Sequence, residues 1–408
     1  MNGRRPRGNR PNGPRIDQVN PCHDHPMSPS RYGFILFSGA NDRAILALCR
    51  AFTEESVDFA VFAMSRDDYV FDTNYRTAVV YTRQDRPLTE RDLRQGLAAA
   101  QHDNPGIRWV ICPTSEYLTQ RLFDHETTLQ EFDCEVVGAG RESYLTLTNK
   151  QSFADWCRRN GFDVPNRCEN QDPTLTPLPF VAKPKRNVDV EGRVLYPHLI
   201  VSERERGRFL EMEDREAFFL EQFVHGQSYY LLFYFNRAGN VTAFSQQNIL
   251  QQGAGKSIIF AKAVQLHHHD LTRRFITALE TERYQGFIMV ELRHSPEGKY
   301  YVIEANPRCW GPLQLTRDSG AGLLEEFFRD YGYFPPAPRR RSDWYLWSGG
   351  AALANRQGLG ITWHTNERWR EVFNIVRALF VADVYLRRDS WKLWCRETLR
   401  TSKGKQAS

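Results

Sequence analysis

Short apolar runs alternate with helix-spaced apolar residues along the first third of the chain. The runs predict buried strands, and the spacing between them predicts helices. The predicted strands lie at 33–38, 57–63, 78–81 and 109–112, and the predicted helices lie at 43–52 and 93–101. Because alternating strands and helices form parallel sheets with helices on their faces, residues 32–140 are expected to form an α/β domain.

After residue 140 the pattern changes to separate helices and strand hairpins, which is typical of an α+β arrangement. Helices are predicted at 149–161 and 271–282, and residues 216–220 are predicted to end a third helix. Strands are predicted at 180–184, 228–235 and 241–244. The strand at 180–184 carries Lys183, and a buried ammonium group requires an anion beside it.

Residues 286–311 contain the strongest candidate site in the sequence. Two apolar runs flank the turn Ser295-Pro-Glu-Gly, which predicts a β-hairpin. In such a hairpin Glu291 and Glu304 face each other, and Asn306 follows at i+2 on the same face. Three oxygen ligands then converge, as Mg²⁺ requires, with nucleotide phosphates completing its coordination shell. Arg308 lies two residues further on and is placed to bind a phosphoryl oxygen.

A solvated strand face is the alternative explanation for these carboxylates. The neighbours of the acidic residues favour the metal site, because the runs 287–292 and 301–305 are apolar enough to bury the hairpin. Buried carboxylates without a partner carry a large energetic cost. A second candidate, Lys256 in a glycine-flanked segment, lacks the spacing of a P-loop and is interpreted as part of a mobile loop over the substrate.

Composition narrows the class of protein. The 408 residues are enough for two or three domains. The net charge is only +5, with the excess concentrated in the first 31 and last 40 residues, so no nucleic-acid partner is expected. The eight scattered cysteines, without a CxxC pair, indicate reduced thiols and a cytoplasmic protein. Residues 1–31 are predicted to be a disordered basic tail, and no transmembrane segment is expected.

In chain order, several of these segments resemble the ATP-grasp superfamily. They are Asn149-Lys150, Gly161-Phe-Asp-Val-Pro165, Phe180-Val-Ala-Lys-Pro184, Leu220-Glu-Gln-Phe-Val-His-Gly226 and the Glu291…Glu304-Ala-Asn-Pro-Arg308 hairpin. The segment 304–315 is also similar to predicted carboxylate–amine ligases related to carbamoyl-phosphate synthetase. The resemblance implies a flavodoxin-like N-terminal domain and a two-lobed ATP-grasp domain at 141–335. It also implies a lid at about 180–250, and a C-terminal helical extension at 336–408 is expected.

The resemblance also implies residue roles. Lys150 and Lys183 would bind the nucleotide phosphates, and Lys183 would act with Arg308 in phosphoryl transfer. The adenine hinge would comprise Glu221, Gln222 and Val224, and Ser228 stands where relatives often carry a ribose-binding Glu. Lys256 would contribute from its loop. The metal ligands would be Glu291, Glu304 and Asn306, holding Mg²⁺ or, alternatively, Mn²⁺.

The implied reaction is ATP-dependent ligation of a small-molecule carboxylate to an amine through an acylphosphate. Three alternatives stay open: a kinase acting on a small-molecule hydroxyl, a nucleotide-binding module without catalysis, and a membrane-surface adaptor. The last rests on aromatic and aliphatic residues among many arginines at 367–400, which could form a basic amphipathic helix with weak membrane contact. A helical subdomain packed on the core explains the same pattern. A homodimer is a further open arrangement.

Overall fold

A parallel five-stranded sheet begins the part of the chain that the computed structural model describes, residues 31–84, 87–185, 195–253 and 255–399. Its strands are β1 (Arg31–Phe37), β2 (Phe59–Ala63), β3 (Val79–Thr82), β4 (Ile107–Ile111) and β5 (Glu135–Val136), in the order β3-β2-β1-β4-β5. The α/β prediction is confirmed. The flavodoxin-like order is wrong, because that fold places the first strand between the second and third. Strand order depends on long-range pairing, which the local pattern does not contain.

Helices cover both faces of this sheet. They are α1 (Asp42–Glu54), α2 (Glu90–Asp103), α3 (Glu116–Asp124) and α4 (Glu126–Glu131). Helix α1 packs on one face, whereas α2, α3 and α4 share an apolar cluster with the other. A capping box between Thr89 and Asp92 begins α2, which fixes where the helix starts. Short 3₁₀ turns lie at Tyr69–Asp72, Asn74–Ala78, Arg215–Ala217 and Leu266–His268.

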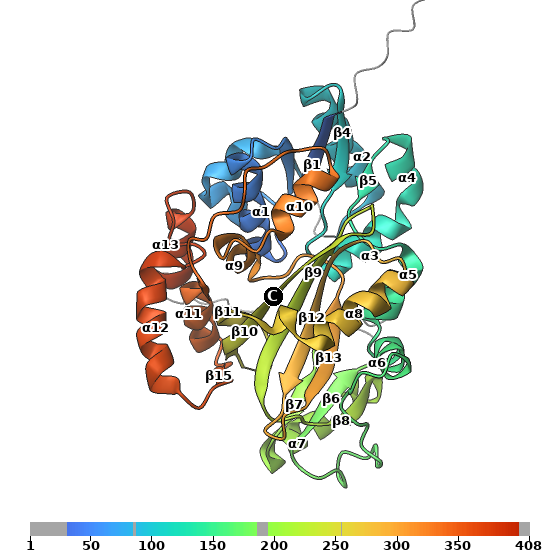
Figure 1. Cartoon of the computed structure of the whole chain (residues 1–408), viewed down its shortest axis with the longest axis vertical. Helices are drawn as coiled ribbons and strands as arrows, with labels where there is room; N and C mark the ends of the chain where they lie inside the picture. The colour runs from blue at the N-terminus through green and yellow to red at the C-terminus, as the bar shows by residue number, and fades with distance from the viewer. Residues whose placement is uncertain (1–30, 85–86, 186–194, 254, 400–408) are drawn as a thin grey trace, which may run out of the picture. The chain divides into compact units, whose positions relative to one another are not determined.

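The second sheet has seven strands and is antiparallel (Figure 1). Its main strands are β9 (Gln227–Phe235), β10 (Val241–Gln252), β11 (Ile258–Val264), β12 (Gly286–His294) and β13 (Tyr300–Asn306). One face packs against α6 (Lys150–Arg159) and α8 (Asp270–Thr281). The other packs against α9 (Leu313–Asp318) and α10 (Leu323–Asp330), which join α1 in one apolar cluster. Helix α5 (Arg141–Thr148) precedes α6.

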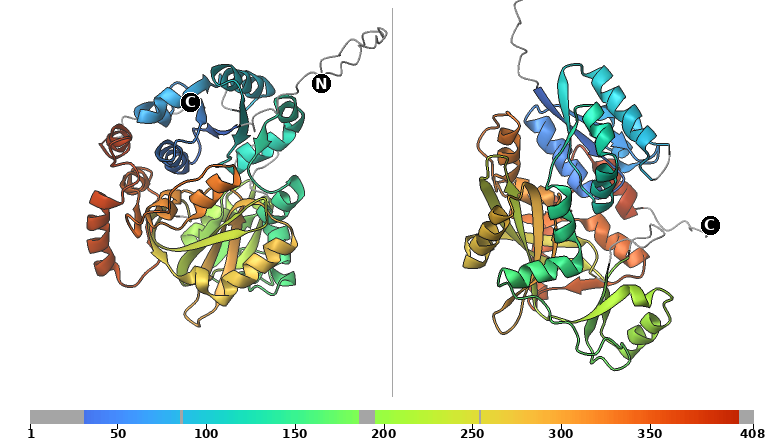
Figure 2. Two further views of the ribbon diagram at one scale, coloured as in Figure 1. Left: turned by 45° about the horizontal axis from the view of Figure 1, so that its top comes forward. Right: turned by 90° about the vertical axis from the view of Figure 1, so that its right-hand side faces the viewer.

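A small sheet of three strands is separate from the large one and appears in green in Figure 2. It contains β6 (Phe180–Pro184), β7 (His198–Ile200) and β8 (Phe218–Gln222), with helix α7 (Glu203–Leu210) packed on it. Residues 216–220, predicted to end a helix, enter β8 instead, because Phe218, Phe219 and Leu220 bury on this sheet. The segment 180–250, expected as one lid, is divided between the two sheets, since β9 and β10 belong to the larger one.

The C-terminal segment, which was predicted to be a helical extension, contains both strands and helices. Strands β14 (Trp344–Leu346) and β15 (Ile361–Trp363) pair with β11 and β10 of the large sheet. Helices α11 (Ser348–Arg356), α12 (Arg368–Val381) and α13 (Trp391–Leu399) complete it. From residue 31 on, the described residues pack as one unit, and the domain limits at 140 and 335 stay predictions.

The sequence also led to predictions about the basic tail, the cysteines and membrane-spanning segments. The predicted basic tail lies, except for Arg31, outside the described residues. Cysteines within the described ranges carry free thiols. Across those same ranges, none of the helices combines the length and apolar character that crossing a bilayer requires.

An ion pair between buried Arg50 and partly buried Asp389 ties the C-terminal segment to the parallel sheet domain. Arg50 of α1 donates from Nε to Asp389 Oδ2 at 2.7 Å and from Nη2 to Oδ1 at 3.1 Å. Tyr75 donates its hydroxyl to Asp389 at 2.7 Å. Replacing Arg50 with Met is expected to destabilise the protein by roughly 3–5 kcal/mol, because the carboxylate keeps its burial and loses its countercharge.

The measurement is thermal melting combined with limited proteolysis of residues 331–399. The control is Arg158→Met, because Arg158 forms an exposed pair with Asp155 on α6. That change is expected to cost less than about 1 kcal/mol. Equal melting of the two variants would contradict a stabilising role for the Arg50 pair.

Candidate functional site

The hairpin of β12 and β13 places the three expected oxygen ligands on one face. Glu291 pairs directly with Glu304, and Met289 pairs with Asn306. Because alternate residues of a strand share a face, Glu291, Glu304 and Asn306 lie on the same side of the sheet. The turn is closed by the Ser295 amide, which donates to the Lys299 carbonyl at 2.8 Å. The local sequence therefore builds this part of the site.

A bulge at Ile303 links the hairpin to the small sheet. Glu291 pairs with Glu304 and Leu292 pairs with Val302, so Ile303 is an extra residue on β13. The Ile303 carbonyl accepts a hydrogen bond from Lys183 Nζ at 3.3 Å. The ammonium group of β6 is thus held directly beside the two carboxylate-bearing strands.

Charged and amide groups around Glu304 form a continuous chain. Lys150 donates from Nζ to Glu304 Oε2 at 2.7 Å, and Asn306 donates from Nδ2 to Oε1 at 2.8 Å. Arg308 donates from Nη2 to Asn306 Oδ1 at 3.0 Å. Lys150 is the first residue of α6, and Asn149 is the N-cap of that helix. The start of the helix therefore fixes the position of the Lys150 backbone. The structure therefore brings Lys150, Lys183 and Arg308 to the same hairpin.

The two facing carboxylates have different electrostatic environments. Burial would raise the pKa of Glu304, but the ammonium of Lys150 and the amide of Asn306 lower it to about 2. Burial raises the pKa of Glu291 despite the neighbouring Arg293, and the negative charge of Glu304 adds to the rise. Burial opposes the charge of Lys150, yet Glu304 raises the pKa of that lysine overall. Glu304 is thus a permanently ionised anchor, whereas Glu291 gains most from an added cation.

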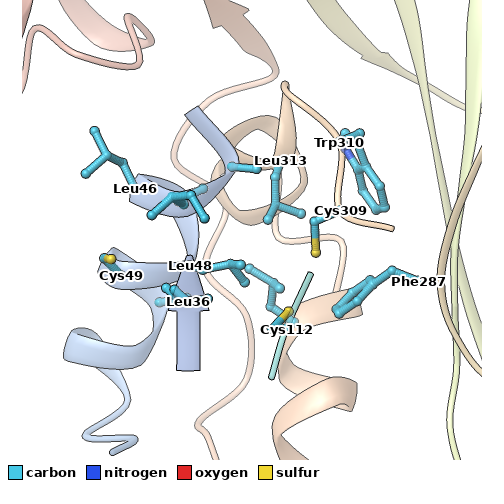
Figure 3. Packing of buried hydrophobic residues seen from close by; sticks show 14 of the residues in the cluster. Leu36, Leu46, Leu48, Cys49, Cys112, Phe287, Cys309, Trp310 and Leu313 are labelled. Carbon is cyan, nitrogen blue, oxygen red and sulfur yellow. The ribbon is translucent and has the colours of Figure 1, made fainter. Parts of the chain in front are cut away.

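The residues after Arg308 fix that side chain by burial. Cys309 and Trp310 are almost completely buried and pack near Leu313 and Phe287 (Figure 3). The Trp310 and Phe287 rings lie 6.2 Å apart in an edge-on arrangement. Arg308 also donates from Nη1 to the Cys309 carbonyl at 3.2 Å. The buried Cys309 and Trp310 therefore fix the backbone after Arg308, and the Cys309 carbonyl and Asn306 hold its guanidinium.

The expected hinge residues lie on and after β8. Glu221 is buried and forms an ion pair with Lys183, with Oε2 and Nζ 2.6 Å apart. Gln222 is exposed at the end of β8, and its backbone N–H donates to the backbone carbonyl of Asn166 at 2.9 Å. Val224 is half-buried in the connection to β9. The structure thus places the Glu221 carboxylate directly beside the ammonium of Lys183.

Ser228 and Lys256 each form a hydrogen bond with a residue of β10. Ser228 is fully buried, and its Oγ accepts a hydrogen bond from Asn248 Nδ2 at 3.0 Å. The Lys256 carbonyl accepts from Gln251 Nε2 at 2.7 Å, and its ammonium lies 5.7 Å from the centre of the Tyr196 ring. Lys256 therefore approaches Tyr196, in the segment that leads into β7.

Arg293 and His364 belong to the site and were missed in the sequence. Arg293 donates from Nη2 to Glu291 Oε1 at 3.2 Å, and its Nη1 lies 2.8 Å from His364 Nδ1. Because arginine only donates, His364 Nδ1 accepts, and its Nε2 donates to Gln251 Oε1 at 2.7 Å. Arg293 stands at i+2 from Glu291, a spacing that could have identified it. His364 follows β15, and local sequence gives no signal for that approach.

Buried amides of β10 were also missed. Gln246 and Asn248 are fully buried, and Gln246 donates from Nε2 to Asn248 Oδ1 at 2.7 Å. Gln246 pairs with Tyr230, which pairs with Glu291, so its side chain shares the face of the carboxylates. Its Oε1 finds no hydrogen-bond partner within the described ranges. A buried acceptor of this kind favours a donor supplied by a bound molecule.

His364 provides a test of this arrangement by pH. Burial and the positive charge of Arg293 lower the pKa of His364 to about 3. Between about pH 3 and the usual pKa of 6.5, His364 is protonated in the unfolded chain but neutral in the folded protein. The free energy of unfolding therefore falls as the pH decreases through this range. His364→Ala is expected to remove roughly 2–3 kcal/mol of the acid-induced destabilisation between pH 6.5 and 4.

Urea unfolding of the wild type and the variant at both pH values measures the difference. His102→Ala serves as control, because that imidazole is exposed. The dependence of the free energy of unfolding on pH should be the same for His102→Ala and the wild type. The same dependence for His364→Ala would contradict a neutral His364 in the folded protein.

The donor set fits a divalent cation. Within the described ranges, no group of three or more His, Cys, Asp or Glu side chains forms a metal cluster, so the candidate ligands are two carboxylates and one amide. Carboxylate and amide oxygens suit Mg²⁺, which keeps part of its shell for water and phosphate. The ligand oxygens are bound by cationic groups of the chain itself, and burial makes the Glu291 carboxylate costly to ionise. A metal ion would displace Lys150, Arg293 and Arg308 from these oxygens, and nucleotide phosphates would then balance their positive charges.

A cavity of about 260 Å³ lies next to the hairpin. Its walls come from α3, α4, the residues after β5 and Pro307, which immediately precedes Arg308. Tyr144 lines it, and burial raises the pKa of that phenol. The cavity is therefore a mainly apolar recess at the edge of the candidate active site.

Comparison with known proteins places the fold. No protein-family model matches the chain, and no curated protein matches its sequence. A Campylobacter jejuni biotin carboxylase in complex with an ATP analogue has a TM-score of 0.56 at 16% identity, covering 75% of this chain and 72% of that one. An N5-carboxyaminoimidazole ribonucleotide synthetase in complex with ADP has a TM-score of 0.55 at 14% identity, covering 86% and 97%.

A third similar structure is the biotin carboxylase domain dimer of Hydrogenobacter thermophilus 2-oxoglutarate carboxylase, in complex with MgADP, ADP and bicarbonate. Its TM-score is 0.55 at 12% identity, covering 77% of this chain and 73% of that one. Identities this low establish a shared fold. The resemblance to the ATP-grasp superfamily drawn from the sequence is confirmed at that level.

Proposed function

We propose that this protein is an ATP-dependent ligase that joins a small-molecule carboxylate to an amine in the cytoplasm, forming a C–N bond through an acylphosphate. The observation that carries the proposal is the direct pairing of Glu291 and Glu304, with Asn306 on the same face and Lys150, Lys183 and Arg308 beside them. Proteins of this fold bind ADP or an ATP analogue. The fold and the residue set point to the same chemistry.

The chain's residues supply positioning and charge neutralisation for phosphoryl transfer. Glu291, Glu304 and Asn306 would hold Mg²⁺, which would supply positive charge against the phosphates of the nucleotide. Lys183 is held by Glu221 and the Ile303 carbonyl so that its ammonium is fixed before ATP arrives. Arg308 is held by Asn306 Oδ1 and the Cys309 carbonyl, and would stabilise the transferred phosphoryl group. Such preorganised cations lower the barrier without a protein nucleophile.

The acylphosphate would form when the substrate carboxylate attacks the γ-phosphorus and ADP leaves. The amine then attacks the acyl carbon, loses a proton, and inorganic phosphate leaves. The acceptor of Gln246 faces this side of the sheet and would receive a hydrogen bond from the amine. The recess beside Pro307 would accommodate an apolar group of one substrate.

Product analysis tests the reaction. The full chain, ATP and Mg²⁺ are incubated with pools of small carboxylates and amines, and products are identified by mass spectrometry. An amide together with ADP and phosphate supports the proposal. A phosphate ester with ADP and no free phosphate would assign a kinase. ATP binding without turnover in any pool would assign a nucleotide-binding module.

A further inference from the structure

Helix α12 carries two apolar stripes, and the described chain covers one of them. The inner stripe comprises Ile375, Ala378, Leu379 and Ala382, which pack against β10, β11 and β14. This spacing of i, i+3, i+4 and i+7 is that of one helix face. The inner stripe fully explains how the helix attaches to the large sheet, so the remaining apolar residues of α12 need another explanation.

The outer stripe faces solvent. It consists of Trp369 (77% exposed), Val372 (50%), Phe373 (71%), Val376 (56%) and Phe380 (77%). These positions again follow helical spacing, so they form one continuous line on the side away from the sheet. Figures 1 and 2 show no drawn element on that side of α12. Single exposed apolar residues are ordinary, whereas an aligned row of large ones marks an interaction surface.

Arginines flank the outer stripe. Arg368, Arg370 and Arg377 are exposed on the same helix, and Glu371 is buried against Lys262 on the inner side. Residues 368–408 contain ten Lys and Arg and four Asp and Glu, an excess larger than the net charge of +5 for the whole chain. Residues 368–408 therefore carry a net charge of +6, and the rest of the chain carries a net charge of −1.

We propose that the outer stripe of α12 docks the protein on an anionic membrane surface. A helix with bulky apolar residues on one side and basic residues at its margins lies in the bilayer interface, where the apolar side chains enter the headgroup region and the arginines meet lipid phosphates. Trp369 at the start of the stripe suits this position, since indole prefers the interface. The inner stripe keeps the catalytic core attached.

A second copy of the chain fits the stripe less well. The helix has 14 residues, so the stripe is about 21 Å long and about 10 Å wide, roughly a quarter of the ~800 Å² that each partner contributes to a stable interface. Pairing two identical stripes would also bring two sets of arginines together. An anionic surface instead attracts both the apolar and the basic parts of α12.

The two ends of the chain contain too few apolar residues to cover the outer stripe. Residues 400–408 contain one apolar residue, Ala407, and residues 1–30 contain few large apolar side chains. A segment of that composition cannot bury five large apolar residues. Neither end of the chain is therefore the occupant of the stripe.

Co-sedimentation with vesicles tests the proposal. The full chain is mixed with vesicles of phosphatidylcholine alone or with about 30% phosphatidylserine, at low and high salt. We expect binding to the anionic vesicles that decreases with salt. The variant W369S/F373S/F380S should bind at least about tenfold more weakly, because it loses most of the inserting apolar surface. The variant R368Q/R377Q should lose the preference for phosphatidylserine.

The control is F334S, because Phe334 is 89% exposed outside α12. Every variant retains the basic N-terminal tail, so vesicle binding that survives unchanged in the stripe variant would assign binding to the tail and overturn the proposal. A dimer that the stripe variant converts to a monomer, without vesicle binding by the wild type, would assign the stripe to a second copy and also overturn it. Melting is measured throughout, and single variants W369S and F380S replace the triple variant if it unfolds.

Discussion

Replacing Glu304 with Gln is expected to reduce ATP turnover at least about a hundredfold. Glu304 is the carboxylate that Lys150 and Asn306 keep ionised, with a pKa of about 2, so it carries a full negative charge at any working pH. Gln preserves the size of the side chain and removes that charge. The expected loss therefore reports on cation binding at the hairpin rather than on packing.

The variant has a side effect that a second substitution separates. Without its carboxylate partner, the ammonium of Lys150 stays buried and unpaired, which lowers stability. The double variant Glu304→Gln with Lys150→Met should recover the melting temperature but not the turnover. Turnover is measured at saturating ATP with varied Mg²⁺.

The control for this prediction is Glu297→Gln, because Glu297 lies exposed in the turn of the same hairpin. Its turnover should equal that of the wild type. Retention of turnover by Glu304→Gln, with normal melting, would remove Glu304 from the metal site and leave the hairpin without a catalytic explanation.

Replacing Lys183 with Met is expected to weaken ATP binding by roughly ten- to a hundredfold. Lys183 is buried beside Glu221 and held by the Ile303 carbonyl, so its ammonium is oriented in advance. A charge-assisted hydrogen bond to a phosphate oxygen is stronger from such a fixed donor than from a mobile one. Lys256→Met should have a smaller effect, because Lys256 is not held in this way.

Calorimetric titration with ADP measures the change, and Lys185→Met is the matched control. Lys185 lies two residues further along, where its exposed ammonium donates to the Glu216 carbonyl. The double variant Lys183→Met with Glu221→Gln separates lost binding from the instability of an unpaired Glu221. A larger effect from Lys256→Met than from Lys183→Met would mean that the phosphates bind elsewhere.

Local sequence predicted the hairpin of β12 and β13 well because one short segment contains both strands and the turn. Pro296 and Gly298 fix the turn, and the apolar runs set the register that pairs Glu291 with Glu304. The strand β6 with Lys183 was also predicted to the residue. These elements depend on neighbours in sequence, which a pattern records directly.

The errors share a different cause. Residues 245–252 continue β10, although their polar character suggested that the strand ended at Phe244. They are buried because β9, β11 and β15 pair with this part of β10, so tertiary pairing overrides the low strand propensity of the polar residues. The apolar segment 218–222 fits a strand or a helix end equally well, and pairing with β6 decides between them. His364 reaches the site through the pairing of β15 with β10, which no local pattern specifies.

The late position of β14 and β15 in the chain has a consequence for synthesis. Until residues 344–363 leave the ribosome, β11 pairs with β10 alone and its outer edge lacks β14. The end of β10 likewise lacks β15. The Arg50–Asp389 pair joins residues 339 positions apart, so it closes later still. A nascent or prematurely terminated chain would expose an unpaired strand edge, which favours aggregation. Correct assembly of this protein therefore depends on translation continuing past Asp389.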